Sequence, residues 1–221
     1  MEIIERPATQ LAEQWMAPVF LFILVIIAWA RWRHPGYFTR LLNAFVNSRI
    51  LRQVMREESV DTRQNFLFTL VFCLVMGLFL FATAKVFLIN IWGLTGFLLF
   101  LLLTALPAVV YTIKSFFIRT VKVISDGDFS LDQYLCNVFL INRMVALVLL
   151  PCVLILCYTN LENVYLSIWI YWAILGSFWL YRLFRGTMGA LESKVPLFYI
   201  FFYICNFEIL PAIICLRFII P

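Results

Sequence analysis

Long runs of apolar residues, separated by short polar links, dominate the chain. A helix needs about 20 apolar residues to cross the roughly 30 Å hydrocarbon core of a bilayer, and six runs approach or reach that length. They are expected at about residues 15–30, 66–84, 91–113, 134–158, 164–184 and 196–220. The pattern therefore predicts an all-α, polytopic membrane protein with six transmembrane helices, in which residues 1–221 form a single transmembrane domain.

The link after the first run has a helical pattern of its own. Over residues 38–55, apolar side chains recur three or four positions apart, which is typical of one face of a helix. We expect an interfacial amphipathic helix on the cytoplasmic leaflet, and a membrane-resting connector without a partner is the plainer alternative. Arginines on its other positions are expected to contact anionic phospholipids or a partner protein. These arginines are Arg40, Arg49, Arg52 and Arg56.

Composition and charge exclude several classes of protein and orient the chain. Hydrophobic residues make up 64% and charged residues 13%, against about 45–50% and 25% in soluble domains, which argues against a soluble enzyme or a nucleic-acid-binding domain. The net charge is +5, and fourteen of the seventeen Lys and Arg residues fall in the three long polar links or at their edges. Positive charge marks the cytoplasmic side, so both termini are expected in the periplasm.

An acidic residue in the last run is the most prominent candidate site. Glu208 lies about 12 residues into this run, with Asn206 before it and Pro211 after it. A carboxylate inside a membrane is costly. Glu208 is therefore expected to couple proton or ion movement or to recognise a polar group; the plainer alternatives are that it is protonated, or that it pairs with a polar group of another span. The partners considered are Asn137, Asn142, Arg143 and Lys85.

Two basic motifs lie at the predicted inner boundary. Arg143, next to Asn142, is expected to extend its side chain to the cytoplasmic interface. Arg182 and Arg185 are expected to form a basic pair where a helix stops, with Gly186 at its C-terminal cap. No G-x-x-x-G motif occurs and 18% of the residues are aromatic, so the spans are expected to pack through large side chains, or against partners and lipid.

Motifs of common enzymes and metal sites are missing from the sequence. It holds no H-E-x-x-H, G-x-S-x-G or phosphate-binding loop, and its six cysteines form no C-x-x-C pair. We therefore expect no catalytic residue, no metal and no cofactor, and hence a protein that is not an enzyme.

Several short stretches carry a family resemblance. They are residues 56–58, 134–142, 149–151, 181–186 and 198–211, and the last, which ends in Glu208-Ile209-Leu210-Pro211, is the most specific. Over roughly residues 38–217 the chain resembles a Bacteroidota integral membrane family described as domain of unknown function 4271. The resemblance implies a bacterial inner (cytoplasmic) membrane protein and no catalytic residues.

These observations leave three hypotheses about function. The leading one is a non-catalytic subunit or accessory factor of an inner-membrane complex, in protein export or envelope biogenesis, that binds other membrane proteins and no nucleic acid. The second is a small transporter or channel that uses Glu208. The third is a lipid-modifying membrane enzyme in which Glu208 serves as acid or base.

Overall fold

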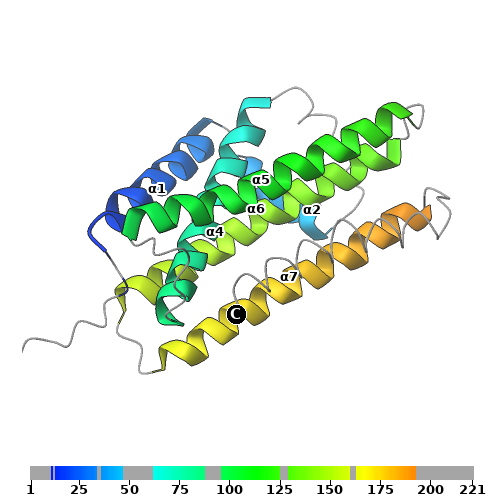
Figure 1. The fold of residues 1–221 in the computed structure, drawn as a ribbon. Helices are drawn as coiled ribbons and strands as arrows, with labels where there is room; N and C mark the ends of the chain where they lie inside the picture. Colours follow the sequence, from blue (N-terminus) through cyan, green and yellow to red (C-terminus); the bar gives the residue numbers. More distant parts are fainter. Residues whose placement is uncertain are drawn as a thin grey trace, which may run out of the picture.

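The structure, a computed structural model, describes residues 11, 13–33, 36–46, 62–87, 96–124, 129–159 and 163–192, and in these it contains helices and no strands (Figure 1). The helices are α1 (Met16–Arg33), α2 (Tyr37–Val46), α4 (Thr62–Val86), α5 (Gly96–Ile124), α6 (Phe129–Tyr158) and α7 (Val164–Glu192). The predicted span at 196–220, with Asn206 and Glu208, lies outside the described residues. So do Arg49, Arg52 and Arg56, whereas Arg40 belongs to α2.

Five of these helices are long and apolar enough to cross a membrane. The candidate spans are Met16–Arg33, Phe66–Val86, Gly96–Phe116, Asn137–Tyr158 and Val164–Met188. Each overlaps one of the first five predicted runs, so the prediction of several apolar helices that could cross a membrane is confirmed for the described residues. The helices α5, α6 and α7, of 29, 30 and 29 residues, are longer than predicted. At 1.5 Å per residue they reach about 44 Å, which exceeds the hydrocarbon thickness.

The spans alternate in direction, which gives the bundle two distinct ends. Contacts between Trp15 and Phe97 (5.5 Å between ring centroids) and between Phe20 and Tyr158 (5.9 Å) place the start of α1 beside the start of α5 and the end of α6. We call this the Glu13 end. The opposite end, where α1, α5 and α7 finish and α4 and α6 begin, carries nearly all the lysines and arginines of the described helices, and we call it the basic end.

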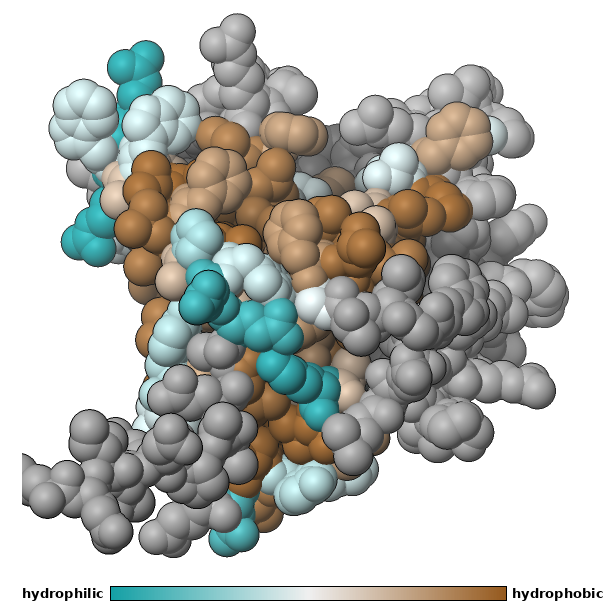
Figure 2. All heavy atoms as spheres, turned by 60° about the vertical axis from the view of Figure 1, so that its left-hand side comes forward, coloured by the Kyte–Doolittle hydropathy of each residue, from teal (hydrophilic) through white to brown (hydrophobic). Residues whose placement is uncertain are grey.

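Helix α4 is the centre of the bundle. It packs against both α5 and α6, and its Val75, Leu78 and Phe79 are completely buried. Helix α7 lies along α6 and is the most exposed span, with 6% of the residues in its most apolar 18-residue stretch buried. Many large apolar side chains are exposed on the outer surface, and brown residues fill the centre of the face shown in Figure 2. Such a surface suits lipid rather than water.

A glycine sets the distance between α4 and α5. A Cβ atom added at Gly77 would lie 2.0 Å from Oγ1 and 2.9 Å from Cα of Thr104. This crossing therefore differs from the expected packing through large side chains, because the absence of a side chain at Gly77 lets the two backbones approach.

Candidate functional site

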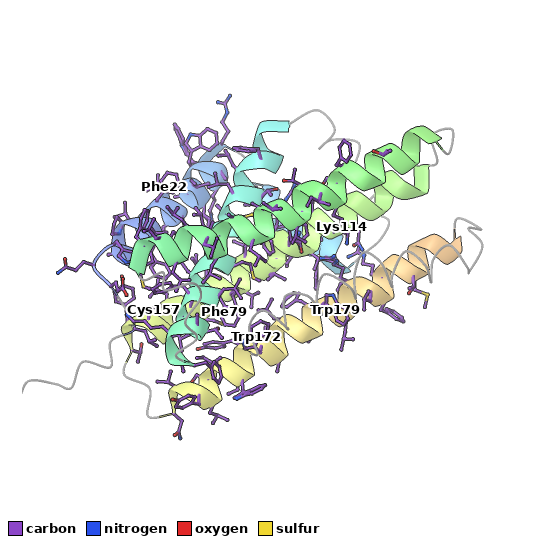
Figure 3. All side chains as sticks on the ribbon, in the orientation of Figure 1. Phe22, Phe79, Lys114, Cys157, Trp172 and Trp179 are labelled. Carbon is purple, nitrogen blue, oxygen red and sulfur yellow. The ribbon has the colours of Figure 1, made fainter. Side chains whose placement is uncertain are left out.

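Polar and charged side chains from three helices come together inside the bundle, toward its basic end. We call them the buried basic network: Tyr111 and Lys114 of α5, Asn142 and Arg143 of α6, and Arg182 of α7. The four residues other than Tyr111 are between 3% and 7% exposed. Figure 3 labels Lys114 in the half of the bundle toward α2, away from Cys157 near the opposite end of α6. Buried cations are rare and energetically costly, so their clustering makes this region a candidate functional site.

Tyr111 is the centre of this network. Its hydroxyl accepts a hydrogen bond from Nη1 of Arg182 at 2.9 Å and donates one to Oδ1 of Asn142 at 3.1 Å. Its ring packs edge-on against Phe72 of α4, with 5.3 Å between centroids. One tyrosine therefore joins α4, α5, α6 and α7, and its hydroxyl satisfies polar groups on two of them.

Arg143 is buried rather than extended to the interface. Its side chain is 3% exposed, and its guanidinium lies 5.6 Å from the centroid of the Phe68 ring on α4. A guanidinium over an aromatic face is attracted by the ring quadrupole, more strongly when water is excluded. The expected snorkelling of Arg143 is therefore wrong: α4 offers an aromatic partner at the same depth.

Two other side chains of the 181–186 motif hold the C-terminal end of α2. Arg185 donates from Nη1 to the carbonyl of Phe45 at 2.6 Å and from Nη2 to the carbonyl of Ala44 at 2.7 Å. The hydroxyl of Tyr181 donates to the same Phe45 carbonyl at 2.6 Å. The last carbonyls of a helix lack partners within it and carry partial negative charge, so a cation and a hydroxyl suit this position.

Packing reinforces these bonds, and we call the whole contact the α2 clamp. The Phe45 ring lies 4.7 Å from Tyr181 and 6.0 Å from Phe178, and Leu41 and Ala44 of α2 are buried. The clamp fixes both the position and the rotation of α2 on α7.

The structure thus gives the 181–186 motif two roles. Tyr181 and Arg185 are four residues apart and share the face of α7 toward α2, whereas Arg182 points to Tyr111. The expectation that Gly186 ends the helix is wrong, because α7 continues to Glu192. The spacing of four was visible in the sequence, but the carbonyls that Arg185 binds were not.

Asn137 is buried one and a half turns before Asn142. It is 3% exposed, and neither its Oδ1 nor its Nδ2 has a hydrogen-bond partner among the described residues. Buried amides normally have partners, so Asn137 is an exception to that rule.

The Glu13 end holds a separate ion pair. Nζ of Lys85 lies 2.9 Å from Oε1 of Glu13 and also donates to the carbonyl of Leu11 at 3.4 Å. Trp15 donates from Nε1 to the other Glu13 oxygen and packs on Phe100 at 4.9 Å. Lys85, one of the expected partners of Glu208, therefore ties the start of α1 to the end of α4.

The contact between Glu13 and Lys85 is expected to weaken in acid. Burial alone raises the pKa of Glu13, but hydrogen bonds from Lys85 and Trp15 and the Lys85 charge outweigh it and hold the pKa below the ordinary 4.5. A lowered pKa stabilises the fold above pH 4.5, and this contribution is lost as the pH falls through the folded value. The melting temperature in detergent should be higher for the wild type than for Glu13→Gln at pH 7. The gap should shrink as the pH falls below 4.5 through the lowered pKa of Glu13; a gap that does not change over this range would contradict the assignment.

The chemical capacity of the buried basic network follows from its groups. Lys and Arg donate hydrogen bonds and carry positive charge, so together they can hold a carboxylate or a phosphate. Glu13 is the one acidic side chain that the structure describes, and it lies at the other end. Among the residues that the structure describes, no three His, Cys, Asp or Glu side chains lie close enough together to bind a metal ion.

An apolar surface and five helices that are long and apolar enough to cross a membrane indicate a helical membrane protein. The chain belongs to the family described as domain of unknown function DUF4271, whose model matches residues 16–219. The family resemblance of the sequence is thereby confirmed. No curated protein matches the chain, and neither does any solved structure.

Proposed function

We propose that this protein is a non-catalytic subunit or accessory factor of a bacterial inner-membrane complex, acting in protein export or envelope biogenesis. The α2 clamp is the observation that carries the proposal. Arg185 and Tyr181 place three short hydrogen bonds on the last carbonyls of α2. These groups hold a short helix in one orientation, which suits a protein that presents a surface to a partner.

The charge distribution supports an orientation in the membrane. We place the basic end in the cytoplasm, following the enrichment of Lys and Arg on that side of bacterial membranes. The sixth span at 196–220 then returns the chain to the periplasm, so that both termini lie there. The α2 helix and the residues after it form an interfacial amphipathic segment, in which arginines contact anionic phospholipids or the partner. These arginines are Arg40, Arg49, Arg52 and Arg56.

The role of the clamp is tested by purification from native membranes. We expect Arg185→Gln to reduce recovery of the bound partner while the protein itself reaches the membrane, because α2 loses two bonds and its orientation. The matched control is Arg33→Gln, which removes one exposed charge at the same end. Equal partner recovery from both variants would contradict a presenting role for α2.

A small transporter or channel is the second candidate. The burial of Lys114, Arg143 and Arg182 within the bundle favours it, because ionisable side chains inside membranes often line substrate or ion pathways. Under this alternative, loss of the charges abolishes activity while the protein remains folded and abundant. Under the leading proposal, abundance and phenotype fall together.

A further inference from the structure

We propose that the second half of α7, residues 176–192, moves about a hinge, and that two contacts which hold it against α6 form and break together. One contact is the α2 clamp, and the other is the hydrogen bond between Arg182 and Tyr111. A displacement of α2 at the basic end is thereby transmitted to the core of the bundle. The inference goes beyond the proposed function, because it holds whatever α2 binds.

The first half of α7 is fixed by apolar packing on α4. Ile168 is completely buried, and the ring of Trp172 lies 5.3 Å from that of Phe79, centroid to centroid (Figure 3). Among the α7 side chains whose burial the structure describes, Ile168 and Arg182 are the buried ones. They are fourteen residues apart, or about 21 Å along the axis. The helix is therefore anchored at two separate points.

The second half of α7 is held by polar contacts instead. Arg185 and Tyr181 donate to the last carbonyls of α2 at 2.6–2.7 Å, and Arg182 donates to the Tyr111 hydroxyl at 2.9 Å. The Arg182 guanidinium also lies 5.8 Å from the centroid of the Tyr111 ring. Hydrogen bonds between N–H and O span about 2.7–3.2 Å, so movement of this half by about 1 Å breaks them.

Both contacts also connect α7 to α6. Tyr111, which Arg182 binds, donates to Asn142 of α6 at 3.1 Å. Helix α2, which Arg185 binds, packs against α6 as well. If the second half of α7 moves away from α6 while α2 and Tyr111 stay in place, both contacts break. Each contact therefore stabilises the other, and such coupling is reciprocal.

The sequence between the two anchors provides a hinge. Gly176 and Ser177 are adjacent there, and sharp bends in helices occur at Gly/Ser pairs. The Ser177 hydroxyl donates to the carbonyl of Ile174 at 2.7 Å, and a serine that bonds to its own helix backbone favours bending. A Cβ added at Gly176 meets no described atom within 4 Å, so no described side chain holds the helix at this point.

The hinge is tested by amide hydrogen exchange of the whole protein in detergent, with α1 as the internal reference. Gly176→Ala should slow exchange of the α2 amides about fivefold relative to α1, the factor that corresponds to the helix propensity gained. The matched control is Thr187→Ala, which also raises helix propensity and removes a hydroxyl bond to the carbonyl of Phe184, but lies beyond both anchors. Unchanged α2 exchange in Gly176→Ala, or equal slowing in the control, would overturn the hinge.

The coupling is tested by weakening the contact that does not involve α2. Tyr111→Phe removes the hydroxyl that Arg182 binds and changes no residue of the α2 clamp. Exchange of the α2 amides should then rise about fivefold or more relative to α1, the lower end of ordinary coupling between two sites. Tyr165→Phe, which changes an exposed tyrosine, should leave this ratio unchanged. Equal acceleration in α1 and α2 would show a general loss of stability and would overturn the coupling.

Arg182→Lys is a milder second variant. It keeps a cation in the core but loses the planar guanidinium beside the Tyr111 ring. Exchange of the α2 amides should rise relative to α1 by a smaller factor than in Tyr111→Phe, and Gly176→Ala in the same chain should reverse part of the rise. Unchanged α2 exchange in Arg182→Lys would overturn the coupling.

Discussion

Gly77→Leu should prevent stable folding of the helical bundle. Even a single Cβ at Gly77 would lie 2.9 Å from Cα of Thr104, an atom that cannot move without shifting α5. Overpacking a well-packed core costs about 1–3 kcal/mol, and separating two helix backbones affects the whole interface. We expect little protein in the membrane and a strongly lowered melting temperature in detergent.

A matched substitution controls for added volume. Ala105→Leu places the same side chain on α5 next to Thr104, but at an exposed position, so it should leave abundance and melting temperature nearly unchanged. Adding Thr104→Ala to Gly77→Ala should recover part of the lost stability, because the nearest clashing atom is the Thr104 hydroxyl. If Gly77→Leu were as stable as Ala105→Leu, the close crossing of α4 and α5 would be refuted.

Tyr111→Phe should produce the second large loss of stability. The change keeps the ring on Phe72 but removes the hydroxyl that accepts from Arg182 and donates to Asn142. Two buried polar groups then lose a partner, at about 1–3 kcal/mol for such a group. The measurement is thermal unfolding of the purified protein in detergent.

The control for this prediction is another tyrosine. Tyr165→Phe keeps its ring contact with Phe87 and removes an exposed hydroxyl at the Glu13 end, so it should be nearly neutral. Equal melting temperatures for the two variants would show that the Tyr111 hydroxyl does not hold the bundle together.

Hydrophobic run length predicted the helical architecture well. A span must satisfy its own backbone hydrogen bonds in lipid, so about 20 consecutive apolar residues leave few alternatives to a helix. The ends of the helices were less predictable. Residues 114–124 read as a polar link because they hold Lys114 and Lys122, yet α5 continues through them. Charge marks where a helix leaves the hydrocarbon, and not where it stops.

The candidate site was predicted only in part. Asn142, Arg143, Arg182 and Arg185 stood out as polar residues near the inner boundary, but their partners come from distant segments. In the sequence, Tyr111 resembles an ordinary interfacial tyrosine. The sequence also does not indicate that the backbone carbonyls of Ala44 and Phe45 accept hydrogen bonds from Arg185. Gly77 belongs to no sequence motif. Only the packed structure shows that this glycine lies opposite Thr104.

The mass and composition of the complex extracted from native membranes in mild detergent test the central proposal most directly. A non-catalytic subunit predicts this protein in fixed ratio with a second, larger membrane protein. A pure homo-oligomer of this chain that encloses a polar cavity would contradict that account and support a transporter or channel.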